Sequence, residues 1–150
     1  MAFDNLLNLL SNLKEDTVPV WGKMTPQHMI EHLVLAVQTS NGKLIINKCI
    51  SPPEKYPLMI RILLSSKPLP KNFINPVLGE GLQPLVYPNL ETSILRLNNE
   101  INDFIIYFEE HPEAKMLNAT FGPLNFEEWK IFHNKHFTHH FTQFGLLESN

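Results

Sequence analysis

The chain has 150 residues, 43% of them hydrophobic, and a formal net charge of -3 at pH 7. A chain of this size fits a single domain (residues 1–150) with its own core, and its composition excludes the disordered class. Its twelve lysines and arginines are scattered, which argues against a nucleic-acid partner, and no apolar stretch approaches the ~20 residues needed to span a membrane. The single cysteine, Cys49, permits no intrachain disulfide and no thiolate metal cage, so we expect a cytoplasmic protein.

The first predicted element is a short helix, because leucines recur at helical spacing between Leu6 and Leu13. This stretch carries Asp4, has no early basic residue and is not followed by a small-residue cleavage site. We therefore interpret it as an amphipathic helix of the mature chain rather than as a signal peptide.

A second helix has a clear predicted start. Thr25 is a good N-cap, and Pro26 stands at the first helical position, where its missing N–H costs nothing. We expect this helix to run to about Thr39, before the Asn-Gly pair that follows. Its apolar arc is centred on Leu33, and His32 lies on one shoulder of that arc.

The middle of the chain is rich in proline. Eight prolines lie between Gly42 and residue 88: Pro52, Pro53, Pro57, Pro68, Pro70, Pro76, Pro84 and Pro88. They exclude long regular elements, apart from a short helix over Leu58 to Leu64. We expect a long irregular connection, which in a compact domain is often functional or a lid.

Two longer helices complete the prediction. The third shows the spacings of four and three that are typical of a bundle helix, at Leu90, Ile94, Leu97, Ile101, Phe104 and Phe108. It ends at His111-Pro112. The fourth begins at Asn125, with Glu128 completing a capping box, and runs to Gly145. We therefore predict an all-α fold, a four-helix bundle with a long proline-rich connection between helices 2 and 3.

Histidines gather on one face of the predicted fourth helix. At about 100° per residue, His133, His136 and His140 lie within roughly 60° of one another. Trp129 and Phe144 share that face, which indicates that it points into the bundle. A buried neutral imidazole needs partners for both ring nitrogens, and an unpaired one costs roughly 1–3 kcal/mol. A metal ion would supply one partner to each ring.

A mononuclear site needs three or four ligands, of which one helix supplies two comfortably, at positions i and i+4. The second helix offers His32, and His28 one turn earlier. We predict that His32, His136 and His140 bind a divalent metal, with positions left open for water or substrate. A single histidine on a helix is more often a solvated or packing residue, but three on one face make that interpretation less favourable.

Other kinds of catalytic site fit the sequence less well. A di-iron carboxylate bundle uses Glu-x-x-His pairs, and no glutamate here is followed by histidine three residues later. A zinc-protease motif is absent, because Glu31 stands directly before His32 rather than after His28. Catalysis by a Ser-His-Asp triad stays open, although no Gly-x-Ser-x-Gly elbow is present.

Three stretches resemble the DinB-like (DinB/YfiT) superfamily, in a branch known as a domain of unknown function. They are Trp21 to Leu33, Phe121 to Leu124 and His136 to Gly145. The resemblance covers nearly the whole chain and implies a four-helix bundle, often a homodimer, that binds nickel or zinc through positions matching His32, His136 and His140. Gln143 matches a glutamine that often follows the last ligand. Phe141 stands where many relatives have arginine, which removes any anion-binding role of that position.

The resemblance also implies a class of activity. Some members resemble S-transferases or isomerases that hold a low-molecular-weight thiol against the metal. Metal binding lowers the pKa of a bound thiol, as it does for water, and His133 or Glu31 would then be a second-shell partner or proton carrier. Two functions stay open: a metal-dependent transferase or hydrolase acting on a small molecule, and a non-catalytic bundle, metal-stabilised or metal-free, that acts through its dimer surface.

Overall fold

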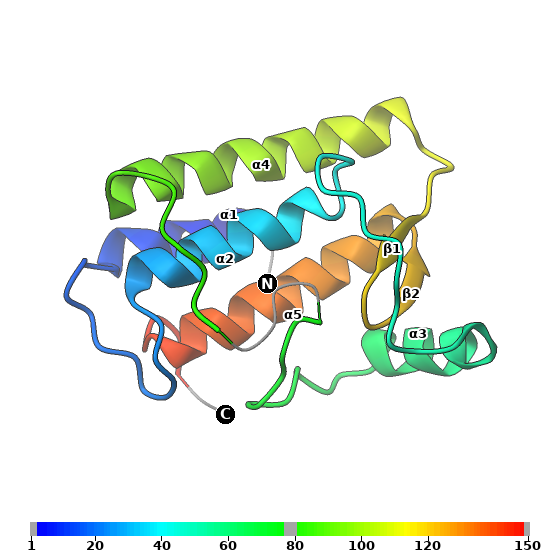
Figure 1. Ribbon diagram of the computed structural model, residues 1–150, viewed down its shortest axis with the longest axis horizontal. Coiled ribbons are helices and arrows are strands. Elements are labelled where there is room, and N and C mark those ends of the chain that lie inside the picture. The colour runs from blue at the N-terminus through cyan, green and yellow to red at the C-terminus, as the bar shows by residue number, and fades with distance from the viewer. Residues whose placement is uncertain (1–2, 77–80, 149–150) are drawn as a thin grey trace.

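The computed structural model describes residues 3–76 and 81–148. Its elements, in chain order, are α1 (Phe3–Asn8), a 3-10 helix (Leu9–Asn12), α2 (Pro26–Gln38), a second 3-10 helix (Pro53–Lys55), α3 (Tyr56–Leu64), α4 (Leu90–Glu110), β1 (Met116–Asn118), β2 (Gly122–Leu124) and α5 (Phe126–Gln143) (Figure 1). The helical class predicted from the sequence is confirmed. Among the described residues, no helix has the length and apolar character that crossing a membrane requires.

The predicted helix ends are confirmed at atomic detail. The Thr25 hydroxyl accepts a hydrogen bond from the backbone N–H of His28 at 3.2 Å, and Pro26 begins α2. At the start of α5, the Asn125 side chain accepts from the backbone N–H of Glu128, and the Glu128 carboxylate accepts from that of Asn125, both at 2.9 Å. These reciprocal bonds satisfy two backbone donors that an uncapped helix would leave unpaired.

The long connection has a topological reason, because α2 and α4 run in the same direction (Figure 1). Near the start of α2, Gln27 donates to the carbonyl of Tyr87, just before α4. At the end of α2, Gln38 donates to Glu100, in the middle of α4. Two parallel neighbours cannot be joined by a short turn, so the chain must travel back along α2, about 20 Å, before α4 begins. The third helix predicted within this connection is present as α3.

A two-stranded hairpin departs from the all-α prediction. β1 pairs antiparallel with β2, with Asn118 opposite Gly122. The Asn118 side chain accepts from the backbone N–H groups of Thr120 and Phe121, at 2.9 and 3.0 Å, and so holds the turn. The strands have three residues each and no alternation of apolar and polar residues, which is why periodicity did not reveal them.

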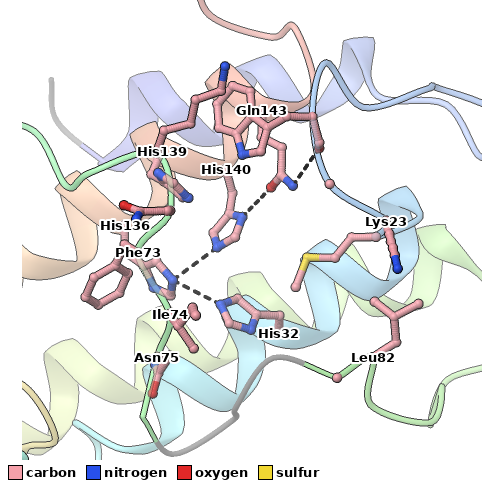
Figure 2. Close-up of a pocket in the computed structure, with 16 residues that line it drawn as sticks. Lys23, His32, Phe73, Ile74, Asn75, Leu82, His136, His139, His140 and Gln143 are labelled. Carbon is pink, nitrogen blue, oxygen red and sulfur yellow. Dashed lines mark hydrogen bonds between the residues drawn. The ribbon is translucent and has the colours of Figure 1, made fainter.

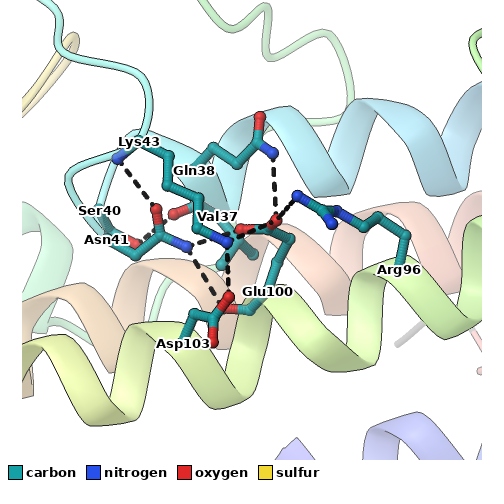
Figure 3. Close-up of polar contacts among 8 residues, drawn as sticks. All are labelled: Val37, Gln38, Ser40, Asn41, Lys43, Arg96, Glu100 and Asp103. Carbon is teal, nitrogen blue, oxygen red and sulfur yellow. Dashed lines mark hydrogen bonds and ion pairs between the residues drawn. The ribbon is translucent and has the colours of Figure 1, made fainter.

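A buried carboxylate fixes the end of α2 against α4 (Figure 3). Glu100 is fully buried and accepts from Asn41 at 2.7 Å, and it pairs with Lys43 at 3.0 Å and Arg96 at 2.7 Å. Burial alone would raise the pKa of Glu100, but hydrogen bonds from Asn41, Lys43 and Gln38 outweigh it and hold that pKa below its ordinary value. The carboxylate is thereby kept charged, and the segment after α2 is anchored.

Candidate metal centre

Three imidazoles converge where α2 crosses α5 (Figure 2). His32 comes from α2, and His136 and His140 come from successive turns of α5. The Nε2 atom of His136 lies 3.0 Å from Nε2 of His32 and 3.2 Å from Nε2 of His140. Within residues 3–76 and 81–148, these three side chains form the one group of three or more metal-ligating residues, with ligand atoms within 4.8 Å of one another.

The spacing of the three nitrogens fits a single metal ion. Imidazole nitrogens bind such ions at about 2.0–2.1 Å, so two ligands of one ion lie about 2.9 Å apart at a right angle and about 3.4 Å apart at the tetrahedral angle. The two measured separations, 3.0 and 3.2 Å, fall within this range. The three histidines could therefore hold a divalent ion with little rearrangement.

Gln143 fixes which nitrogen of His140 faces the centre. The Gln143 Nε2 group donates to the backbone carbonyl of Trp21 at 3.0 Å, so its Oε1 atom is the one that faces His140. Nδ1 of His140 lies 2.7 Å from that oxygen and must carry the proton in order to donate. Nε2 of His140 is then an unprotonated lone pair aimed at the other two rings, as a metal ligand requires.

The His136 ring cannot satisfy its own hydrogen bonds without a cation. Its Nδ1 atom is buried and has no hydrogen-bond partner, although the ring is fully buried. Its Nε2 atom faces both other rings, but a neutral ring nitrogen offers either one proton or one lone pair. One of the two contacts is therefore left unsatisfied, whereas a cation would accept a lone pair from all three rings.

Burial keeps the three rings in the form that binds metal. Burial first, and the charge of His139 second, lowers the pKa of His32 to about 4. Burial also holds the pKa values of His136 and His140 well below their ordinary range, and the neighbouring imidazoles lower them further. All three are neutral at pH 7, so no proton competes with a metal ion for their lone pairs.

The cluster forms part of the wall of a pocket of about 520 Å³. In Figure 2, Lys23 and Leu82 lie on one side of the three imidazoles, and Phe73, Ile74 and Asn75 lie on the other. The lining residues are Trp21, Gly22, Lys23, Met24, His32, Lys71, Asn72, Phe73, Ile74, Asn75, Gly81, Leu82, His136, His139, His140 and Gln143. Three ligands leave at least one coordination position free, and here that position would face the pocket.

The two residues predicted to assist catalysis lie elsewhere. His133 is fully buried among aromatic rings of the core, and its Nε2 atom lies 2.7 Å from the Ser40 hydroxyl. The Glu31 carboxylate accepts from the backbone N–H groups of Val86 and Tyr87, at 2.7 and 3.3 Å. Neither side chain lines the pocket, so the geometry gives His133 and Glu31 structural contacts and no route to the centre.

The other two histidines considered from the sequence are also placed. His28 contacts the Thr25 hydroxyl at 2.7 Å through Nδ1, at the exposed start of α2, and does not line the pocket. His139 lines the pocket but stands outside the cluster of three, with its ring edge-on to that of Trp21 at 5.7 Å. The prediction that His139 faces away from the other α5 ligands agrees with this position.

The segment before α2 contributes residues that the spacing of histidines did not identify. Trp21 holds the Gln143 amide through its carbonyl, and Gly22 adopts a φ of +84° that side chains rarely adopt. A Cβ atom on Gly22 would lie 2.7 Å from Nε2 of Gln143. The Trp-Gly pair in the sequence was the available signal, since a glycine beside an aromatic residue indicates a close backbone approach.

No protein-family model matches the chain, and comparisons with curated proteins and with solved structures give no match either. The site is therefore argued from its own residues.

Proposed function

We propose that this protein binds a divalent metal ion through His32, His136 and His140, and that it uses the free coordination position in catalysis. The observation that carries the proposal is the convergence of three Nε2 atoms, one of them with its tautomer set by Gln143, in the wall of an open pocket. A set of three imidazoles suits zinc and nickel, which are the ions we infer. A site with three protein ligands and one free position is the usual catalytic arrangement.

We infer metal-dependent thiol transfer or hydrolysis as the reaction class. A divalent ion with a free position lowers the pKa of a bound thiol or water, so that the nucleophile forms at neutral pH. The chain itself supplies the orientation: Gln143 holds His140, and the aromatic core around His133 holds the turn of α5 that precedes His136. Phe73 and Leu82 contribute apolar walls that limit the access of water to the centre.

The wider assignment rests on the residues that resemble the DinB-like superfamily. We infer that α1, α2, α4 and α5 form its four-helix bundle, and the arrangement in Figure 1 supports this, since α5 runs opposite to α2 and packs beside it. The expectation of a homodimer stays a prediction.

Substitution with cobalt tests both the centre and its free position. One equivalent of Co²⁺ should give visible d–d bands in the wild type and in a His139→Ala control, and none in a His140→Ala variant. A low-molecular-weight thiol should then add a sulfur-to-cobalt charge-transfer band. Cobalt bands that neither thiol nor azide alters would show a closed site, and would favour the non-catalytic, metal-stabilised bundle over an enzyme.

A further inference from the structure

The pocket at the metal centre has a one-sided charge. Its described lining includes two lysines, Lys23 and Lys71, and no aspartate or glutamate. The three ligands are neutral imidazoles, so a divalent ion held there would keep its full charge of +2, whereas a site with carboxylate ligands would neutralise part of it. A molecule that enters this pocket therefore meets positive charge from the centre and from the walls.

The two lysines belong to separate segments and have no acidic partner. Neither Lys23 nor Lys71 forms an ion pair within the described residues, whereas Lys43 and Lys130 do. Lys23 precedes α2, and Lys71 lies in the proline-rich connection. Their positive charges are thus not compensated by the protein itself, which leaves them to a ligand.

Lys71 is held in place by the wall that also positions a metal ligand. Its Nζ atom lies 4.7 Å from the centre of the Trp21 ring, a cation–π contact. The carbonyl of Trp21 accepts from Gln143, which in turn fixes His140. The ammonium group and the coordination centre therefore share one rigid support, so their separation is defined before a ligand binds.

The size and the apolar walls of the pocket exclude a small inorganic ion as its full occupant. The volume of about 520 Å³ is in the range of pockets for organic ligands, and Met24, Phe73, Ile74 and Leu82 contribute apolar surface. An organic molecule with one anionic group uses both the lysines and these side chains.

We propose that the natural ligand of this centre is an organic anion, with a carboxylate or similar group in addition to its metal-binding atom, and that Lys23 and Lys71 select it by charge. This inference rests on the metal centre proposed above and names its substrate class. An exposed ion pair is worth up to about 1 kcal/mol, so we expect each lysine to change the preference for an anion about two- to fivefold.

Three thiols of similar size test this preference on the cobalt-substituted protein: 3-mercaptopropionate (anionic), 2-mercaptoethanol (neutral) and cysteamine (cationic). The charge-transfer band gives a dissociation constant for each. We expect the wild type to bind them in that order of decreasing affinity. The informative quantity is the ratio of the cysteamine and mercaptopropionate constants, because intrinsic differences between the thiols cancel when variants are compared.

Lys23→Gln and Lys71→Gln should each lower this ratio about two- to fivefold, and the double variant should lower it by the product. Lys71→Arg, which keeps the charge, and Lys55→Gln, an exposed position outside the pocket, should leave it unchanged. Bands with every thiol but the same ratio in the glutamine variants would overturn the charge selection alone. The absence of a band with all three thiols would overturn the open metal centre, and this inference with it.

Discussion

Gln143 provides the sharpest test of how the site is built, because it touches no metal and yet determines one ligand's tautomer. In a Gln143→Leu variant, Nδ1 of His140 loses its acceptor at 2.7 Å, and the Trp21 carbonyl loses its donor at 3.0 Å. His140 can then place its proton on Nε2, which removes the lone pair that faces His136. We expect metal affinity to fall while the helix itself persists.

The magnitude follows from the burial of the contact. Gln143 is 5% exposed and His140 is 7% exposed, so water does not replace the lost acceptor. Leaving a buried N–H unpaired costs about 1–3 kcal/mol, and loss of an outer-shell partner typically costs 10–100-fold in metal affinity, about 1.4–2.7 kcal/mol. The two estimates agree, so we expect a decrease in affinity of between ten- and a hundredfold.

Competition with a chromophoric chelator at pH 7.5 measures this change directly. The matched variant is Gln143→Glu, which keeps an oxygen acceptor for His140 and loses only the donor to Trp21. It should bind metal much more tightly than Gln143→Leu. Equal affinity of the leucine variant and the wild type would refute the role assigned to Gln143 in orienting His140.

Three further changes probe other parts of the structure. Gly22→Ala places a Cβ atom 2.7 Å from the Gln143 amide at a φ of +84°, so chelator competition should show weaker metal binding, and unchanged binding would contradict the close approach. Burial lowers the pKa of His133 to about 3, so only the unfolded chain binds this proton between pH 6.5 and 3, and stability is lost as pH falls through that window. Urea unfolding of metal-free protein should therefore lose about 2 kcal/mol less between pH 7 and 5 in His133→Phe than in the wild type, and an identical loss would show that His133 does not carry this effect. Glu31→Ala removes the acceptor of two backbone N–H groups, so hydrogen exchange at Val86 and Tyr87 should become faster with metal affinity within about twofold, since Glu31 makes no contact with the centre; a loss of metal would place Glu31 in the site after all.

The helices could be predicted from the sequence because their signals are local. The Thr25-Pro26 start of α2 and the Asn125 capping box of α5 depend on residues within four positions of each other, and both are present. The direction of α4 relative to α2 depends on packing between distant segments, which no local pattern records. The hairpin at 116–124 was missed because its order comes from Asn118 and from docking on α5, where Trp129 donates to the Met116 carbonyl.

The candidate ligands were predictable for a similar reason. His136 and His140 lie one turn apart, and the inward face of α2 offered His32, so helical geometry brought the three together before any contact was known. His133 has the same face but a different environment, because Ser40 lies opposite it where the antiparallel helices pass. The pocket walls could not be predicted, since Trp21 and Lys71 reach the site through irregular segments whose course depends on the whole fold.

The metal content of the protein, purified without a histidine tag and loaded with zinc or nickel, tests the central claim most directly. We expect close to one equivalent of metal per chain in the wild type and in His139→Ala, and loss of that metal in His32→Ala and His136→Ala. No bound metal in the wild type after loading, or equal loss in the His139→Ala variant, would contradict a centre built from His32, His136 and His140.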